Sequence, residues 1–422
     1  MSPHSRSKTH HLLAKAICAV ALVIACSSNT SLAATFLPLG DLPQGEFGSI
    51  AYGISPDGNI VAGGGTALPY QYRSYEAVLW DSTAKVHALR DSLEDDGFER
   101  RAIAVNNTGD VAVVSAYGLE DHEWDAYYWS ASYGFTSLGH LLDHPSTIVS
   151  GASDDLGVIT GICSYGSSPS IAFRWSAATG IEPLYGDLGA NPGNPTGCNG
   201  RGISADGKVI VGIAGSGDSM EAFRWTAESG MVGLGDLPGG DFTSGAISAS
   251  ADGSVIVGFG TAEESYSVSR AFYWSEVTGM FSLGTLDPDD YASTAELVSA
   301  DGRLVFGVSR QLDDFQPPRI EKSFVWDEAH GMRSFNRVLE TEFGLASDLA
   351  GWGDLFVLDI SSDSLTLVGH GINPDGNREA WKLTLDHPIG IPEPASIVLV
   401  IAGVLAAAWR ARGPNRAACE GR

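Results

Sequence analysis

Short apolar runs recur along most of this chain, separated by Gly, Pro, Asp and Ser. Residues 231–274 show the pattern clearly, with apolar runs at 231–237, 246–250, 255–258 and 270–274. Runs this short, bounded by turn residues, indicate β-strands and not helices. Asp252-Gly253 lies between the second and third runs and indicates a tight hairpin, because Gly accepts the positive φ that such turns need. The pattern therefore predicts a four-stranded antiparallel meander.

This unit repeats with a spacing of about 50 residues. Its third strand ends in a tryptophan six times, at Trp80, Trp129, Trp175, Trp225, Trp274 and Trp326, and a degraded copy lies at 379–383. A Leu-Gly-Asp-Leu strand recurs at 39–42, 89–93, 138–141, 184–188, 234–237 and 283–286, with a weak seventh copy at 335–339. Four strands per repeat at this period are typical of a β-propeller blade. The sequence thus predicts an all-β, seven-bladed β-propeller of four-stranded antiparallel blades over residues 35–386.

The order of strands at the two ends predicts how the ring closes. The first strand, 36–42, is of the type that ends a repeat, and the last, 379–383, lacks that strand after it. Pairing the two would leave no open edge. An open solenoid of the same repeats is the alternative, but it would need capping repeats. In a closed ring the first strand of each blade should line the central channel.

The excess of acidic residues limits the kinds of molecule that the chain can bind. The chain has 51 acidic and 25 basic residues and a formal net charge of −26. Phosphates would be repelled by this charge, so nucleic acid is excluded as a partner.

The N-terminus, 1–33, has the features of an export signal. Arg6, Lys8 and Lys15 precede an apolar run at 16–25, and a small-x-small site ends at Ala33. Residues 23–26 also resemble a lipoprotein box, which would leave Cys26 acylated instead. Export would allow a disulfide between Cys163 and Cys198, and two separate thiols in neighbouring blades are the alternative.

The C-terminus differs from the repeats. A linker at 387–394 ends in Pro392-Glu393-Pro394, and an apolar run at 395–409 is predicted to be a transmembrane helix. Fifteen helical residues span about 22 Å, short of the ~30 Å hydrocarbon core, so snorkelling and local thinning would have to cover the difference. The tail 410–422 carries Arg410 and Arg412 and should stay cytoplasmic.

Chemical motifs are scarce. No nucleophile elbow, zinc-protease helix or phosphate loop is present, so no catalytic residue, cofactor or metal site is assigned. The Asp-Gly turns carry one Asp each, which turn chemistry explains better than calcium binding. Only 287–290 is a dense acidic loop. When the first strands are aligned on Ser55, Arg201 and Glu296 are charged where other repeats are apolar or small, and they are the candidate channel-binding residues.

Both ends together resemble the PEP-CTERM proteins: Pro392-Glu393-Pro394, one hydrophobic segment and an Arg cluster, preceded by a signal peptide. This resemblance implies sorting and cleavage by an exosortase in bacteria that make exopolysaccharide. The repeats resemble the HAF family of extracellular repeats at Ala172-Phe173, Ala222-Phe223 and Ala271-Phe272, and in 234–240. The resemblance implies export and no known reaction.

These features predict an exported propeller at the cell envelope or in the extracellular matrix, anchored transiently or permanently in the inner membrane. A non-catalytic binding or structural role, associated with exopolysaccharide, is the favoured function. The alternative is a hydrolase or lyase acting on extracellular glycans. An enzyme should place two or three non-repeated carboxylates or His residues around the channel, whereas a scaffold should show only repeated residues there.

Overall fold

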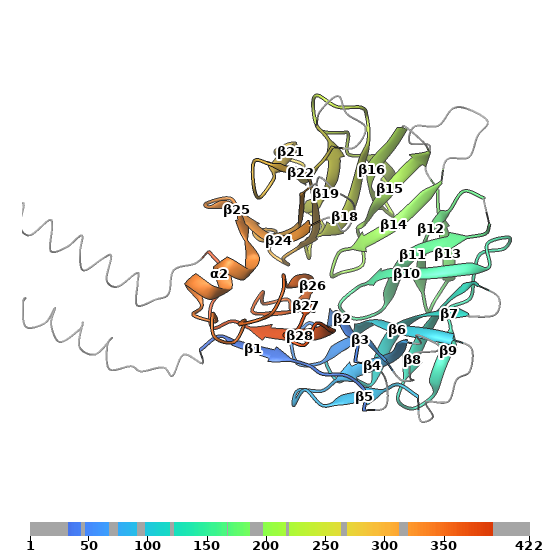
Figure 1. Cartoon of the computed structure of the whole chain (residues 1–422). Helices are drawn as coiled ribbons and strands as arrows, with labels where there is room; N and C mark the ends of the chain where they lie inside the picture. The colour runs from blue at the N-terminus through green and yellow to red at the C-terminus, as the bar shows by residue number, and fades with distance from the viewer. Residues whose placement is uncertain are drawn as a thin grey trace, which may run out of the picture.

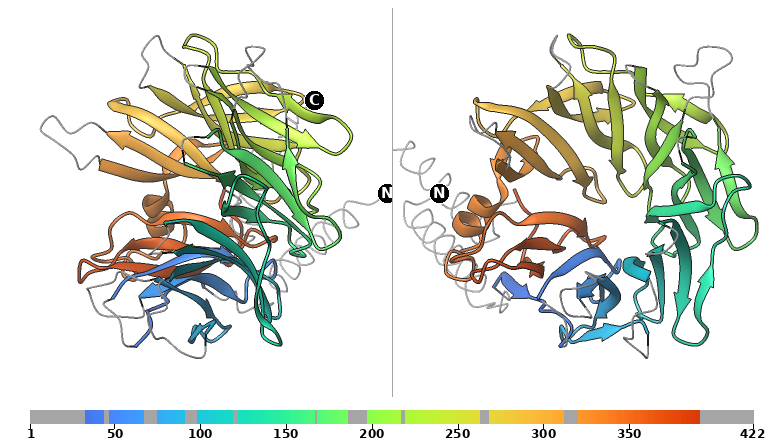
Figure 2. Two further views of the ribbon diagram at one scale, coloured as in Figure 1. Left: turned by 90° about the vertical axis from the view of Figure 1, so that its right-hand side faces the viewer. Right: turned by 45° about the vertical axis from the view of Figure 1, so that its right-hand side comes forward.

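The computed structural model describes residues 33–43, 47–66, 75–90, 98–118, 122–166, 168–185, 197–216, 219–262, 268–311 and 320–390. These residues form seven four-stranded antiparallel sheets arranged as blades around a central axis (Figures 1 and 2). The predicted seven-bladed β-propeller is confirmed. The predicted signal peptide up to residue 32, the Pro392-Glu393-Pro394 motif, the segment 395–409 and the tail 410–422 lie outside the described residues. Within the described ranges, no helix is long and apolar enough to cross a membrane.

Each blade contributes one innermost strand beside the axis. The innermost strands are β2 (Ser49–Ile54), β6 (Phe98–Val105), β10 (Ser146–Ala152), β14 (Cys198–Ile203), β18 (Ser244–Ala249), β22 (Asp290–Val298) and β26 (Phe356–Ile360). The second strands are β3 (Val61–Thr66), β7 (Val111–Gly118), β11 (Val158–Ser164), β15 (Ile210–Ser216), β19 (Val255–Thr261), β23 (Val305–Gln311) and β27 (Thr366–Ile372).

The third and fourth strands follow outward. The third strands are β4 (Tyr75–Trp80), β8 (Trp124–Ser130), β12 (Ile171–Ser176), β16 (Ser219–Thr226), β20 (Ser269–Ser275), β24 (Ile320–Asp327) and β28 (Arg378–Thr384). The outermost strands are β5 (Val86–Ala88), β9 (Gly134–Ser137), β13 (Gly180–Leu184), β17 (Gly230–Gly233), β21 (Gly279–Gly284), β25 (Gly331–Ser334) and, from the N-terminus, β1 (Thr35–Pro38).

The ring closes as the strand order predicts. β1 pairs antiparallel with β28, with Phe36 opposite Leu383. The seventh sheet therefore has the order β1-β28-β27-β26 and contains both ends of the propeller. No strand edge is left open where the chain begins and ends in the ring, which removes a site for edge-to-edge aggregation.

In the copies at 39–42, 138–141 and 234–237 the Leu-Gly-Asp-Leu motif follows the outermost strand and is not part of it, in contrast to the prediction, whereas β21 extends to Gly284 of the copy at 283–286. In the first copy β1 ends at Pro38, and Gly40 then takes a φ of +69°. The Asp41 carboxylate accepts the backbone N–H of Gly48 at 2.8 Å and of Thr66 at 2.9 Å. Because Gly48 precedes the next innermost strand, Asp41 ties the end of one blade to the beginning of the next.

The predicted weak seventh copy at 335–339 is also wrong, because this stretch begins the helix α2 (Phe335–Glu342). Ser334 caps the helix by accepting the N–H of Arg337, and Phe335 and Leu339 are fully buried. Both belong to the apolar cluster that joins the sixth and seventh blades. The helix therefore fills the seam between these blades, as its place in Figure 1 shows. Ile389 lies in the same cluster, so packing continues into the predicted linker.

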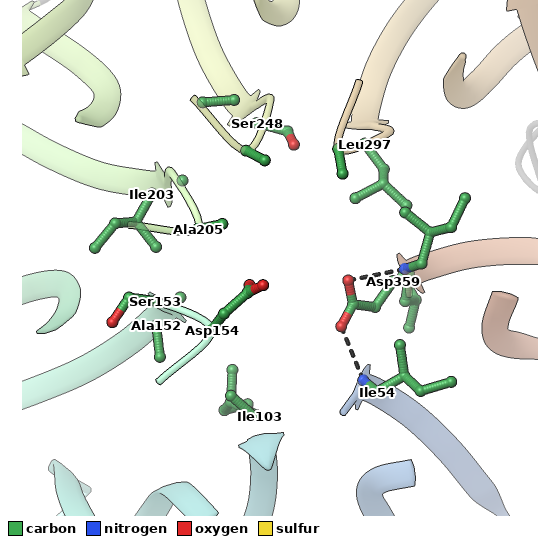
Figure 3. Close-up of a pocket in the computed structure, with 18 of the residues that line it drawn as sticks. Ile54, Ile103, Ala152, Ser153, Asp154, Ile203, Ala205, Ser248, Leu297 and Asp359 are labelled. Atoms are coloured by element: carbon green, nitrogen blue, oxygen red, sulfur yellow. Dashed lines mark hydrogen bonds between the residues drawn. The ribbon is translucent and has the colours of Figure 1, made fainter. Parts of the chain in front are cut away.

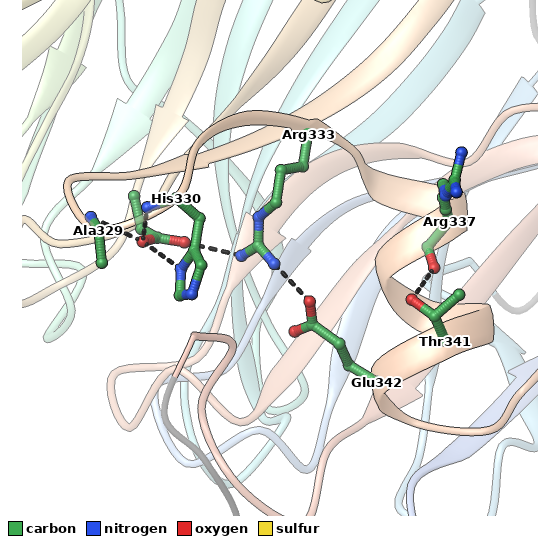
Figure 4. Close-up of polar contacts among 7 residues, drawn as sticks. Ala329, His330, Arg333, Arg337, Thr341 and Glu342 are labelled. Atoms are coloured by element: carbon green, nitrogen blue, oxygen red, sulfur yellow. Dashed lines mark hydrogen bonds and ion pairs between the residues drawn. The ribbon is translucent and has the colours of Figure 1, made fainter.

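A polar chain fixes α2 to the sixth blade (Figure 4). The Arg333 guanidinium donates to Asp327 at 2.7 Å and also pairs with Glu342 in the last turn of the helix. The Asp327 carboxylate also accepts from the His330 ring at 2.8 Å. Arg333 thus links the strand pair β24–β25 to α2 on the outside of the ring.

Packing between blades rests on an aromatic residue two positions before the repeated Trp. Phe223 is fully buried, as are Phe173 and Phe272, whereas Trp225 is only half-buried. A Cβ on Gly212 would lie 2.9 Å from the Phe223 ring, so the glycine makes room for it. The repeated Trp is fully buried in the first blade, at Trp80, whereas in the third to sixth blades the fully buried aromatic residue is Phe173, Phe223, Phe272 or Phe324.

Candidate functional site

Every innermost strand contains a β-bulge, and the bulged residue occupies the position that holds Arg201 and Glu296 in the alignment on Ser55. In β2, for example, the register shifts between Ala51 and Gly53 and leaves Tyr52 without an opposite residue. The seven bulged residues are Tyr52, Ile103, Ser150, Arg201, Ile247, Glu296 and Leu358. A bulge re-aims a side chain, so one residue type per blade can be varied without loss of the strand.

All seven bulged residues line a cavity of about 310 Å³ on the axis. We call them the bulge ring. Arg201 and Glu296, the candidate channel residues, are therefore brought into one cavity, from the fourth and sixth blades. Ile247 of the fifth blade lies between them in the ring. Whether these two side chains bind a ligand stays a prediction.

Neither Arg201 nor Glu296 forms an ion pair or hydrogen bond with any residue in the described part of the chain. A nearby cation, Arg310, is already occupied: it donates to Glu321 and to Thr294, each at 2.9 Å. Burial raises the pKa of the Glu296 carboxyl above its ordinary value, and the charge of Arg310 opposes this. The bulge ring thus holds one guanidinium and one carboxyl group that lack a protein counter-charge within hydrogen-bonding distance.

The far end of the cavity is constricted by the turns that follow the innermost strands. The second residue lines the cavity in six of the seven turns, and backbone hydrogen bonds of 3.0 Å run from Asp154 to Ala205, from Ala205 to Ala251 and from Ala251 to Ala300. The Ser362 hydroxyl of the seventh blade donates to the Asp154 carboxylate of the third blade at 3.0 Å. The backbone hydrogen bonds join the turns of adjacent blades, and the Ser362–Asp154 bond joins turns of two non-adjacent blades.

Asp359 is the second carboxylate near this end (Figure 3). It directly follows the bulged Leu358, at a position where five of the other blades have Gly, Ala or Ser. Its carboxylate accepts the N–H of Ile54, in the first blade, and of Ile360, both at 2.8 Å. Asp359 therefore fastens the seventh blade to the first and also faces the cavity.

Electrostatics at this end are dominated by burial. Burial raises the pKa of Asp359 to about 7, and the charge of Asp154 raises it further, whereas the two backbone N–H groups lower it. Burial likewise raises the pKa of Asp154. The two carboxyls therefore hold a proton more readily than ordinary Asp residues.

Asp154 and Asp359 are not predicted from the sequence as cavity residues, although both are acidic at positions where most other repeats have small or uncharged residues. In the third blade Leu156 takes a positive φ, of +55°, at the turn position that Gly58 has in the first blade, although the sequence Leu156-Gly157 suggests Gly157 for it. When Leu156 is aligned with Gly58, Asp154 is the acidic residue at a turn position that is otherwise Pro, Asn, Ala or Ser. In the alignment on Ser55, Asp359 falls opposite Gly53, and it stands out in the same way as Glu296.

The turns themselves have the predicted local chemistry. Ser250 donates to Asp252 at 2.9 Å and accepts the N–H of Val255, while Gly253 has a φ of +66°. The same Ser-to-Asp hydrogen bond occurs in five other blades. The turn Asp is therefore used inside its own turn.

Cys163 and Cys198 are buried free thiols in this structure, so the suggested disulfide is not formed. Cys198 contacts the Leu184 carbonyl at 3.1 Å and the Ala172 N–H at 3.3 Å, whereas Cys163 lies 3.7 Å from the Thr147 hydroxyl. Each thiol thus has its own neighbours.

The acidic loop at 287–290 has a local explanation. Lys322 donates to Asp287 at 2.5 Å and to Asp290 at 3.0 Å. Ser309 also donates to Asp290, at 2.7 Å. Among the described residues, no group of three His, Cys, Asp or Glu side chains could hold a metal ion.

The two ends of the ring differ in what they expose. Because neighbouring strands are antiparallel, the connections between blades and those between second and third strands lie at one end, here called the loop face. Large apolar side chains exposed there are Phe47, Leu142, Tyr165, Tyr185, Phe242, Ile320 and Ile372. The opposite end, the turn face, exposes Tyr133 and Val277. Exposed apolar side chains in the described part of the chain are therefore concentrated at the loop face.

The ring of seven four-stranded blades defines the chain as a β-propeller. No family model and no curated protein matches the sequence. Among solved structures, the propeller domain of the Trilobed protease from Pyrococcus furiosus is similar at 10% identity, over 84% of this chain and 99% of that one, with a TM-score of 0.48. An oligogalacturonate lyase from Vibrio parahaemolyticus is similar at 10% identity, over 84% and 97%, with a TM-score of 0.48. TolB from Acinetobacter baumannii is similar at 11% identity, over 69% and 81%, with a TM-score of 0.38.

Proposed function

We propose that this chain is an exported propeller that binds neutral polysaccharide at the cell surface through its loop face. One observation carries the proposal: the aromatic rings of Phe47, Tyr165, Tyr185 and Phe242 are 42%, 56%, 71% and 50% exposed at that face. Exposed rings have an apolar surface that can cover the apolar face of a sugar, and concentrated exposed apolar groups mark binding surfaces.

The net charge of the chain indicates which kind of polysaccharide it can bind. With a formal net charge of −26, the chain would repel uronate-rich or sulfated polysaccharides at low ionic strength. A neutral glycan meets no such barrier. The proposed partner is therefore a neutral component of an exopolysaccharide, and not nucleic acid.

Binding can be measured with the full chain and laminarin, a neutral β-glucan, by isothermal titration calorimetry. The double variant Tyr165→Ala/Tyr185→Ala should weaken binding at least tenfold. Tyr133→Ala is the matched control, because Tyr133 is 88% exposed at the turn face. Equal loss in the control and the double variant, or tighter binding of anionic alginate than of laminarin, would contradict the proposal.

Catalysis on extracellular glycans is the second candidate. It is favoured by the three non-repeated carboxyl groups of Asp154, Glu296 and Asp359 in the cavity. Two of them have a structural use, however: Asp154 and Asp359 accept hydrogen bonds that join blades. A reducing-sugar assay on laminarin tests this candidate, with release expected to be abolished by Glu296→Gln if the chain is an enzyme.

Export and sorting form the second part of the proposal and rest on the two ends of the chain. The segment Pro392-Glu393-Pro394 should stay extended, because proline fixes φ and disfavours helix in the preceding residue. Such a peptide just outside the membrane is accessible to an exosortase-type enzyme, while Arg410 and Arg412 orient the segment. Intact-mass analysis of the mature protein from its host should find residues 395–422 removed. Recovery of these residues would leave a permanent anchor as the explanation.

A further inference from the structure

The bulge ring holds two opposite charges in one cavity without a direct partner for either. Arg201 and Glu296 both line the cavity, and no ion pair within the described residues joins them to each other or to a third group. The Glu296 side chain is partly buried, where a charge without a partner is costly unless a ligand or water satisfies it, whereas the Arg201 side chain is exposed. Of the other members of the ring, Ile103, Ile247 and Leu358 offer no hydrogen bond through their side chains, and Tyr52 and Ser150 each carry one hydroxyl group.

The order of blades sets the pattern a ligand would have to match. Arg201 is in the fourth blade and Glu296 in the sixth, with the apolar Ile247 of the fifth blade between them. A molecule reaching both charged groups must pass the Ile247 side chain. Its ends should therefore be an anion and a cation, and its middle should be apolar.

The volume of the cavity and the residues at its far end limit the size and the orientation of a ligand. A volume of about 310 Å³ lies at the small end of ligand pockets, which span roughly 300–1,000 Å³. At the far end Ser362 and Asp154 join turns of two non-adjacent blades, so we place the entry of a ligand at the loop face. The carboxyl groups of Asp154 and Asp359 at the constricted end disfavour an anion there and direct the anionic end toward Arg201.

We infer that this cavity binds a small ω-amino acid, with its carboxylate on Arg201, its ammonium group on Glu296 and its methylene chain against Ile247. The site is separate from the loop-face surface proposed for polysaccharide. Its ligand is a small zwitterion and not a polymer. Failure of one proposal therefore leaves the other intact.

A length series provides the test. The full chain is titrated by calorimetry with glycine, β-alanine, 4-aminobutanoate and 6-aminohexanoate, and with 1,4-diaminobutane and succinate as the dication and dianion of similar length. We expect one of the longer amino acids to bind at least tenfold more tightly than glycine and than either symmetric ion. No binding by any amino acid at millimolar concentration would overturn the inference. Equal binding of the diamine would do so too, because it would indicate a simple cation site.

Variants locate the site. Arg201→Ile and Glu296→Ile copy the residue found at the same ring position in the second and fifth blades, so the strands should fold normally. Each should weaken binding of the best amino acid at least tenfold and leave laminarin binding unchanged. Arg201→Gln and Glu296→Gln serve as polar counterparts, and Arg303→Gln, an exposed turn residue, is the control. Undiminished binding in both Ile variants, with thermal unfolding unchanged, would rule out this site.

Discussion

Phe36 pairs with Leu383 across the two ends of the propeller, and this pairing makes the seventh blade a product of both termini. Phe36 also contacts Trp352 edge-on, with ring centroids 5.1 Å apart, and lies 6.1 Å from the Trp381 ring. The first strand therefore adds apolar packing as well as backbone hydrogen bonds to the closure of the ring.

Removal of this strand should open the ring. Deleting residues 35–38 would expose the edge of β28 and remove Phe36 from the aromatic cluster. We expect a fall of several degrees in the thermal unfolding midpoint, followed in circular dichroism, and concentration-dependent aggregation in light scattering. An unchanged midpoint would show that β1 does not contribute to closure.

The second prediction separates the two aromatic positions of the repeat. Phe223→Ala should lower the free energy of unfolding by ~3–5 kcal/mol, because the side chain is fully buried between blades and leaves a cavity. Trp225→Ala should cost less, since the side chain is only half-buried. Urea denaturation of the two variants measures the difference. A larger loss for Trp225→Ala would return the main packing role to the tryptophan.

How far the sequence predicts this molecule depends on whether a feature is repeated. The blade number, the strand order and the closure through β1 follow from a pattern that recurs seven times. The helix α2 is not predicted, because residues 335–339 resemble a weak copy of the repeat. Ser334 and the buried Phe335 and Leu339 nevertheless fit a capped amphipathic helix. The cavity depends on the β-bulge, for which the sequence has no signal of its own. The alignment on Ser55 nevertheless identifies Arg201 and Glu296 at the bulged position.

The third prediction concerns a non-glycine residue with a positive φ. Ser364 has a φ of +61° at the turn position where five other blades have Gly, so Ser364→Gly should stabilise the protein by about 0.5–1 kcal/mol. The reverse change in the sixth blade, Gly302→Ser, should destabilise it, because a Cβ there would also lie 2.7 Å from Val255. Denaturation midpoints of both variants are compared with the wild type. Shifts of the same sign in both would refute the strain argument.

The fourth prediction is a pH dependence from Asp359. Its folded-state pKa of about 7 lies above the ordinary value of 3.8, so the folded protein retains a proton that the unfolded chain releases. Stability should therefore fall as pH rises from about 4 to about 7. Because the charge of Asp154 contributes to this shift, Asp154→Asn should lower the pKa of Asp359 and reduce the fall.

Thermal unfolding between pH 4.5 and 8 checks this prediction, with Asp143→Asn, an exposed residue outside the cavity, as the control. Overlapping pH curves for Asp154→Asn and the wild type would mean that the two carboxyls do not interact as described.

Polysaccharide binding at the loop face is most directly tested by hydrogen–deuterium exchange of the full chain at saturating laminarin. The account predicts slower exchange in the connections that carry Tyr165, Tyr185 and Phe242. It predicts no change in the turns that carry Tyr133 and Val277 at the opposite end. Protection confined to the turn face, or no protection anywhere at saturation, would contradict it.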